Sequence, residues 1–144
     1  FTKDWLTKLT KSAARHKKTM IVGAKILNPD GTIYHAGALS KIRGKGKLDR
    51  PGLFAKEKKV HWVQGSCFLV KRAVFEKIGG FDEQFFVYGE EVDFCRRVRK
   101  AGYEVLYSPV PIYHSRQGSK IPQQDRLKLR QRSAELLKKK WKKK

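Results

Sequence analysis

The sequence is short of acids and of long apolar runs. Its 144 residues hold 13 Asp and Glu against 34 Lys and Arg, which gives a formal net charge of +21. No apolar stretch approaches the roughly 20 residues that span a membrane, and the first residues lack the apolar centre of a signal peptide. We therefore expect a soluble or peripheral protein, in the cytoplasm or at the inner face of the membrane.

Cysteine is almost absent. Cys67 and Cys95 each lie in an apolar segment, and no CxxC spacing occurs. Free cysteine usually behaves as a small buried hydrophobe, so the pattern predicts two reduced core thiols and a cytosolic setting, with one buried disulfide as the alternative.

The apolar residues that are present follow helix and strand spacings in alternation, which is typical of an α/β domain. The predicted elements are, in order, a helix over 4–16, a buried strand over 19–27, a turn at 28–31, a returning strand over 32–40, an exposed loop over 41–59, a strand over 61–72, a short helix over 73–80, an aromatic loop over 81–89, a helix from residue 90 that ends at Gly102, two short extended segments over 104–115, and a basic helix after residue 120.

The positive charge is concentrated in two segments. One is the loop over residues 41–59 and the other is the lysine-rich end of the chain. We expect a domain over residues 1–120 followed by a basic helical tail over 121–144. Segments of this kind attract polyanions such as nucleic acid, anionic lipid or phosphorylated substrates, but they also occur as plain solvated faces.

A series of motifs in fixed order runs from residue 65 to residue 119. GSCFLVKR is followed by a short helix, then by GGFDE, an aromatic loop, EEVDFCRR, AGY, a strand and the histidine of PIYHS. This order resembles the acceptor-side half of family 2 glycosyltransferases, the GT-A-fold enzymes that include rhamnosyltransferase-like proteins. Residues 4–38 look like the middle part of the same family. The resemblance implies a partial GT-A-like fold, with a mixed sheet flanked by helices.

The resemblance assigns a catalytic role to the acids of EEVDF. The second acid of the family's pair is the general base, which corresponds to Glu91, and Glu90 becomes a supporting carboxylate. This sequence has Glu91 where the family most often has Asp. We expect Asp93 to hold the local backbone or a nearby basic side chain. The alternative is that these acids only stabilise the first turn of a helix through its dipole.

Further site residues follow from the same resemblance. Gly65 and Ser66 are expected to let an acceptor approach the sheet, while Asp82 and Tyr88 are expected to contact it. His114 occupies the position of a metal or diphosphate ligand. The family's donor-binding half, with its D-x-D motif, is missing from this sequence. A divalent cation, Mn or Mg, is therefore expected only together with that half.

The function that these features predict is inverting, metal-dependent transfer of a sugar from a nucleotide-sugar donor to a glycan or lipid-linked acceptor, as in the synthesis of cell-envelope polysaccharide. The basic tail suits an anionic membrane surface. The alternatives are a catalytically inactive fragment and a basic module that binds nucleic acid or an anionic surface, although no RNP-like, helix-turn-helix or zinc spacing supports nucleic acid. An exposed sheet edge also predicts a homodimer.

Overall fold

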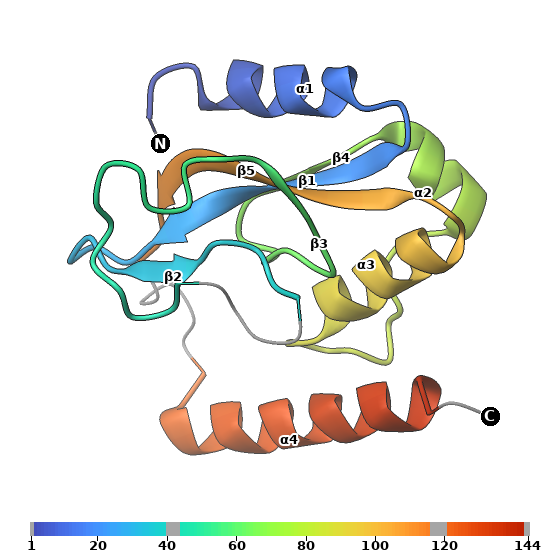
Figure 1. Ribbon diagram of the computed structural model, residues 1–144. Coiled ribbons are helices and arrows are strands. Elements are labelled where there is room, and N and C mark those ends of the chain that lie inside the picture. The colour runs from blue at the N-terminus through green and yellow to red at the C-terminus, as the bar shows by residue number, and fades with distance from the viewer. Residues whose placement is uncertain (1, 40–43, 116–120, 143–144) are drawn as a thin grey trace.

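A mixed sheet with helices on both faces forms the domain, as the sequence predicts (Figure 1). The computed structural model describes residues 2–39, 44–115 and 121–142. Its elements are α1 (Trp5–Arg15), β1 (Thr19–Leu27), β2 (Ile33–His35), β3 (Lys58–Val60), β4 (Phe68–Val70), α2 (Arg72–Ile78), α3 (Glu90–Lys100), β5 (Glu104–Tyr113) and α4 (Gln123–Lys140).

Strand β1 is the centre of the sheet, whose path runs β2-β1-β5-β3. On one side β1 pairs in parallel with β5. On the other side its first half pairs with β4 and its end pairs with β2, both antiparallel. One strand with parallel and antiparallel neighbours makes the sheet mixed, which is the α/β class that the sequence predicts.

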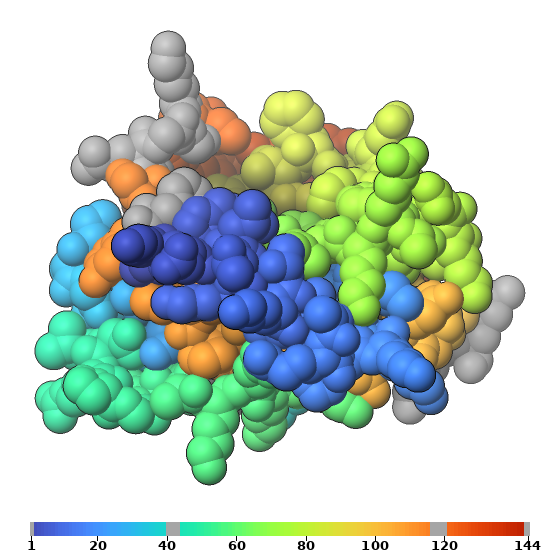
Figure 2. All heavy atoms as spheres, turned by 90° about the horizontal axis from the view of Figure 1, so that it is seen from above, coloured from blue at the N-terminus to red at the C-terminus, as the bar shows by residue number. Residues whose placement is uncertain are grey.

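Strand β1 is buried on both faces because helices cover both. Ile21 and Leu27 belong to an apolar cluster that includes residues of α3, whereas Val22 and Ile26 belong to a second cluster that includes residues of α1. Figure 1 shows α1 on one face of the sheet and α3 on the other, and Figure 2, seen from the α1 side, shows α1 lying across the near face. Gly23 lets the chain approach closely, since a Cβ there would lie 2.3 Å from the Cβ of Val63.

Several predicted extended segments differ from those in the structure. The strand predicted over 32–40 is limited to β2, and β3 begins within the predicted loop over 41–59. Residues 104–113 form one continuous strand rather than two short ones. Its register against β1 shifts between Gly23 and Lys25, so that residues 108–110 face a single residue of β1, and Pro109, which has no N–H to donate, lies in this bulge. The predicted strand over 61–72 shrinks to β4 because Gln64 Oε1 accepts the N–H of Ser66 at 2.7 Å and closes a local turn.

The predicted loop over residues 41–59, of which 44–59 are described, is attached to the sheet. Lys25 of β1 is only 6% exposed, and its ammonium group lies 3.0 Å from Asp49 and donates to the carbonyl of Leu53 at 2.9 Å. Both cysteines are buried and free, which confirms the prediction of reduced core thiols. Among the helices of the described residues, none combines the length and the apolar character needed to cross a membrane.

Helix α4 follows the basic-helix prediction and lies beyond α3, on the opposite side of the sheet from α1 (Figure 1). It contacts the loop that precedes α3 and, at its end, α3 itself. Ser133 donates a hydrogen bond to the carbonyl of Val87 at 3.0 Å, and the guanidinium carbon of Arg130 lies 4.8 Å from the centre of the Tyr88 ring. The basic tail therefore packs against the part of the chain that carries the predicted catalytic acids.

Candidate active site

The turn that leads into α3 contains two residues with a left-handed backbone conformation. Tyr88 has φ 66° and Gly89 has φ 92°. For a residue with a side chain this conformation costs about 1–2 kcal/mol. At Gly89 a Cβ would also meet the side chain of Leu137 at 3.2 Å. This sharp turn begins α3 directly at Glu90, so that Glu90 and Glu91 both fall in its first turn.

A cavity of about 580 Å³ opens in front of these two acids. Five of the seven predicted site residues line it, namely Gly65, Ser66, Tyr88, Glu90 and Glu91. The remaining wall is mostly apolar and consists of Gln64, Phe68, Val70, Phe75, Phe81 and Val87. We call this space the carboxylate cavity. Its volume lies within the range of about 300–1,000 Å³ that is usual for small-molecule sites.

Burial changes the acidity of Glu91. Desolvation and, after it, the nearby charge of Glu90 raise its pKa from 4.5 to about 7, against hydrogen bonds that lower it. One of these bonds is donated by the backbone N–H of Gly89 to Glu91 Oε2 at 3.2 Å. A carboxylate with a pKa near 7 is suited to take a proton at neutral pH.

Glu90 supplies a second sign of a binding site. Its Oε2 atom is buried, and within the described residues it has no hydrogen-bond partner. A buried acceptor without a partner costs about 1–3 kcal/mol, so native structures rarely leave one unless a ligand or water meets it. Because Glu90 lines the cavity, this oxygen is available to a hydroxyl group bound there.

His114 lies beside the carboxylate cavity rather than in it. It lines a neighbouring cavity of about 870 Å³, which we call the basic cavity, together with Tyr34, Gln64, Val87, Tyr88, Gln123, Gln124, Arg126, Leu127 and Arg130. Gln64, Val87 and Tyr88 line both cavities, so the two spaces share a wall. In the described part of the chain, no three His, Cys, Asp or Glu side chains are grouped as metal ligands.

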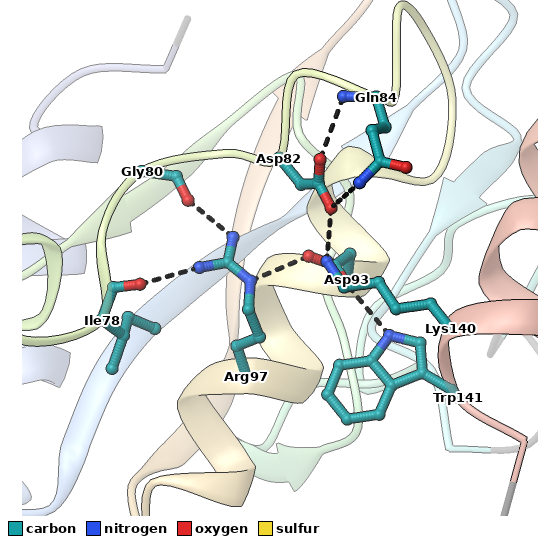
Figure 3. Close-up of polar contacts among 8 residues, drawn as sticks. All are labelled: Ile78, Gly80, Asp82, Gln84, Asp93, Arg97, Lys140 and Trp141. Carbon is teal, nitrogen blue, oxygen red and sulfur yellow. Dashed lines mark hydrogen bonds and ion pairs between the residues drawn. The ribbon is translucent and has the colours of Figure 1, made fainter.

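Asp82 is the predicted site residue that lines neither cavity. Its carboxylate forms an ion pair with Lys140 at the end of α4 and accepts the backbone N–H of Gln84 at 3.0 Å (Figure 3). These donors hold the pKa of Asp82 below its usual value, with the hydrogen bond from Lys140 as the largest cause. The structure thus gives Asp82 a role in fixing the loop before α3, and its predicted contact with an acceptor gains no support from this geometry.

Asp93 is fully buried and joins α3 to the end of α4 (Figure 3). It accepts hydrogen bonds from Arg97 Nε and Trp141 Nε1, both at 2.8 Å, and lies 3.0 Å from Lys140 Nζ. The expectation that Asp93 holds a nearby basic side chain is confirmed. Arg97 lies on the basic side of this helix with Arg96, Arg99 and Lys100, a side that its charge predicts to face outward, but its own side chain points inward.

The side chain of Arg97 turns back onto the chain because acceptors surround it. Besides bonding to Asp93, it donates to the carbonyls of Ile78 and Gly80 at 3.0 Å and 2.6 Å (Figure 3). It thereby ties the end of α2 to the first turn of α3. The same turn carries Glu90 and Glu91. Arg97 and Asp93 therefore help to hold the two glutamates of the carboxylate cavity in position, although neither residue lines the cavity.

Sequence reasoning missed two parts of this site. Gln64 lines both cavities, and its only sequence signal is its place directly before Gly65. The contribution of α4, through Lys140, Trp141 and Arg130, has no local signal, because lysines and arginines in a charged tail look alike until the helix is packed.

The fold and the paired acids in the carboxylate cavity agree with the family that the sequence comparison finds. Residues 9–134 match the model of glycosyltransferase-like family 2, and the chain belongs to this family. The match extends from α1 into α4, so it covers both cavities.

The chain is also similar to individual proteins, among them a rhamnosyltransferase and an O-antigen biosynthesis protein. The chain is 33% identical, over 70% of its length, to the N-acetylglucosaminyl-diphospho-decaprenol L-rhamnosyltransferase of Mycobacterium tuberculosis. It is 33% identical over 85% of its length to the O-antigen biosynthesis protein RfbC of Myxococcus xanthus, and 32% identical over 96% to an uncharacterized protein of Sinorhizobium fredii. The chain spans 38%, 11% and 17% of these three proteins, respectively.

Proposed function

We propose that the intact protein transfers a sugar from a nucleotide-sugar donor to a hydroxyl group of a lipid-linked glycan, and that this chain supplies the acceptor site and the catalytic base. The observation that carries the proposal is the half-buried Glu90 and Glu91 pair at one cavity, with the pKa of Glu91 raised to about 7. The name of the mycobacterial relative, whose acceptor is a sugar on a diphospho-lipid, supports the acceptor class.

In this proposal Glu91 takes the proton of the acceptor hydroxyl. The hydroxyl oxygen then forms a bond to the anomeric carbon of the donor sugar, while the bond from that carbon to the nucleoside diphosphate breaks and the electron pair leaves with the diphosphate. Attack from the face opposite the leaving group inverts the anomeric centre. Glu90, through its unpartnered Oε2, is suited to orient the same hydroxyl or its neighbour.

The shape of the carboxylate cavity fits an acceptor sugar. Tyr88, Phe75 and Phe81 give it aromatic walls, and Phe81 lies in a cluster of rings with centres 5.2 Å from Phe94 and 6.5 Å from Phe75. Such rings pack against the apolar face of a sugar, while the hydroxyl groups at its edge need polar partners. Gln64, Ser66, Tyr88 and the two carboxylates bring polar groups to the cavity for this purpose.

A divalent cation, Mn or Mg, remains a proposal for the intact protein. The described residues do not bring three acidic, cysteine or histidine ligands together, so they do not by themselves fit such an ion. His114 is at most one ligand, beside phosphate oxygens and residues that this sequence does not include. The roles of Glu90 and Glu91 are derived without the ion.

The experiment is a transfer assay with the intact protein, a panel of labelled nucleotide sugars and a diphospho-lipid acceptor that carries N-acetylglucosamine. Glu91→Gln keeps the size of the side chain and removes the base, so we expect transfer to fall by about a hundredfold to ten-thousandfold. Glu83→Gln removes an equally negative, exposed side chain of the preceding loop and is expected to leave transfer unchanged. Full activity of Glu91→Gln, or no transfer by the wild type from any donor, would contradict the proposal.

We also propose that the outer face of α4 meets an anionic membrane surface, where lipid-linked acceptors reside. Exposed basic residues of α4 and of the residues after it include Lys128, Arg132, Lys138, Lys139 and Lys142. Each basic residue near such a surface contributes about 1 kcal/mol. Sedimentation with vesicles that contain anionic lipid is expected to depend on these side chains, and equal binding to neutral vesicles would argue against this proposal.

A further inference from the structure

A third hollow lies between the aromatic loop over residues 81–89 and α4, apart from the two cavities of the candidate active site. Its volume is about 680 Å³, and none of the described residues that line it lines either of the other two. The residues around it come from the loop, from α4 and from the end of the chain, and are Gln84, Arg132, Glu135, Leu136, Lys138, Lys139 and Lys142. We call this hollow the lysine groove.

Positive charge dominates the lysine groove. Among the described residues that line it, four are basic and exposed, and Glu135 is the one acid. Positions 132, 135, 136 and 139 follow one another at spacings of one, three or four residues, so they lie along one side of α4. Basic residues gathered in this way attract an anionic surface.

The ring of Phe86 stands beside this groove and points into solvent. Phe86 is 81% exposed, which is the highest value among the large apolar side chains in the described part of the chain. Phe85, directly before it, is buried, so the loop turns one ring inward and the next one outward. Gln84 lines the groove, and the carbonyl of Val87 accepts the hydroxyl of Ser133 in α4 at 3.0 Å. Phe86 thus lies between two points at which the loop meets α4.

An exposed aromatic ring next to lysines is the composition of a site that lies in a membrane interface. Lysines find partners in the phosphate groups of the lipid heads, while an aromatic ring enters the boundary between the heads and the acyl chains. Leu136, which is half-buried, adds apolar surface to the groove itself. Single-stranded nucleic acid fits less well, because it needs rings on which successive bases stack, and no aromatic side chain is among the described residues that line the groove.

We propose that the lysine groove and Phe86 form one membrane-docking site, in which the groove binds the headgroups of anionic phospholipids and the ring of Phe86 anchors the loop in the bilayer surface. The apolar anchor goes beyond the attraction by charge proposed for α4. Val87 and Tyr88, the next two residues, line both cavities of the candidate active site, so the anchor brings these cavities to the bilayer. The advantage for a lipid-linked acceptor rests on the proposed function, whereas the docking itself does not.

The first test is partitioning of the full chain onto vesicles of phosphatidylcholine and phosphatidylglycerol, measured by sedimentation at about 150 mM salt. Phe86→Ala is expected to weaken partitioning about tenfold, because an interfacial ring gains only the lower part of the free energy of full burial. The matched control is Leu6→Ala, which removes a 52% exposed apolar side chain from α1, on the opposite side of the sheet from α4 (Figure 1), and is expected to change partitioning less than about twofold. Phe86→Trp is expected to retain partitioning, since Trp favours the interface.

The second test concerns the charge of the groove. Lys138→Gln with Lys139→Gln is expected to weaken partitioning about thirtyfold. Higher salt should reduce this effect and leave the effect of Phe86→Ala, because salt screens charge and not apolar burial. Lys8→Gln with Lys11→Gln removes the same charge from exposed positions of α1 and is expected to change partitioning less than about threefold. Circular dichroism checks that each variant is folded.

Unchanged partitioning of Phe86→Ala, equal losses for Phe86→Ala and Leu6→Ala, or equal losses for the two lysine pairs would overturn the proposal, as would the absence of wild-type binding to these vesicles. Binding to single-stranded RNA is measured in parallel. If Phe86→Ala weakens RNA binding as strongly as vesicle binding, the ring serves nucleic acid and the assignment to lipid fails. If the wild type docks on vesicles but transfers no sugar from any donor, the proposed function fails while the docking site stands.

Discussion

Replacing Glu91 by Gln is expected to stabilise the folded chain at pH 8 and to leave its stability nearly unchanged at pH 4. The cause is the burial of Glu91 beside Glu90, which raises its pKa from 4.5 to about 7 in the folded state. Gln has the same shape and is neutral at every pH. Its side-chain oxygen is also able to accept the backbone N–H of Gly89, which bonds to Glu91 at 3.2 Å in the wild type.

The sign follows from proton binding. Below pH 4.5 the side chain is protonated in both the folded and the unfolded state, so it adds no pH dependence. Between pH 4.5 and about 7 the folded state binds more protons than the unfolded state, so the free energy of unfolding falls as the pH rises. At about 1.4 kcal/mol for each pH unit, the full penalty above pH 7 is about 3 kcal/mol.

The assay is urea unfolding of the wild type and of Glu91→Gln at pH 4, 6 and 8, followed by circular dichroism. The variant is expected to gain about 3 kcal/mol relative to the wild type at pH 8, about half of that at pH 6, and little at pH 4. Glu83→Gln, in an exposed position, controls for the general effect of removing one negative charge from a basic protein. Identical gains at all three values of pH, or a loss at pH 8, would refute the reasoning.

Three further substitutions test the frame of the site by urea unfolding. Trp141→Phe removes the N–H that bonds to Asp93 and is expected to lower the free energy of unfolding by about 1.5–3 kcal/mol. An unchanged urea midpoint would argue against this packing of the end of the chain on α3. Gly23→Ala places a methyl group against Val63 and is expected to lower the free energy of unfolding by about 1–3 kcal/mol. If that contact is the cause, adding Val63→Ala to the variant should restore much of the loss. Gly89→Ala, at φ 92°, is expected to lower the free energy of unfolding by at least about 1 kcal/mol and to weaken acceptor binding. Wild-type stability together with wild-type acceptor binding would show that glycine is not needed there.

Local signals explain which elements were predicted well. The strand over residues 19–27 has the predicted bounds, since a run of apolar and β-branched residues bounded by polar segments identifies a buried strand. Helix α3 begins and ends as predicted because acids fill its first turn and Gly102, with φ 84°, follows its end. Such signals lie within a few residues of the feature that they determine.

Contacts between distant segments explain the differences. The prolines of residues 104–115 predict a broken strand, but β5 continues through them. Pro109, which has no N–H, lies in a bulge against β1, and Pro111 lies opposite Lys25 in the resumed pairing. Arg97 looks like one of several solvated arginines, yet it turns inward because the carbonyls of Ile78 and Gly80 lie within its reach. Neither partner can be identified from the helix alone.

The sequence by itself determined the α/β class, the family resemblance and the Glu90 and Glu91 pair, because these depend on residue types in fixed order along the chain. Only the tertiary structure decided that Asp82 faces Lys140, that His114 lies in a separate basic cavity, and that α4 packs over the site. The physical reason is that charge and aromatic character are properties of single residues, whereas burial, a raised pKa and a shared cavity wall arise only when segments far apart in the sequence come into contact.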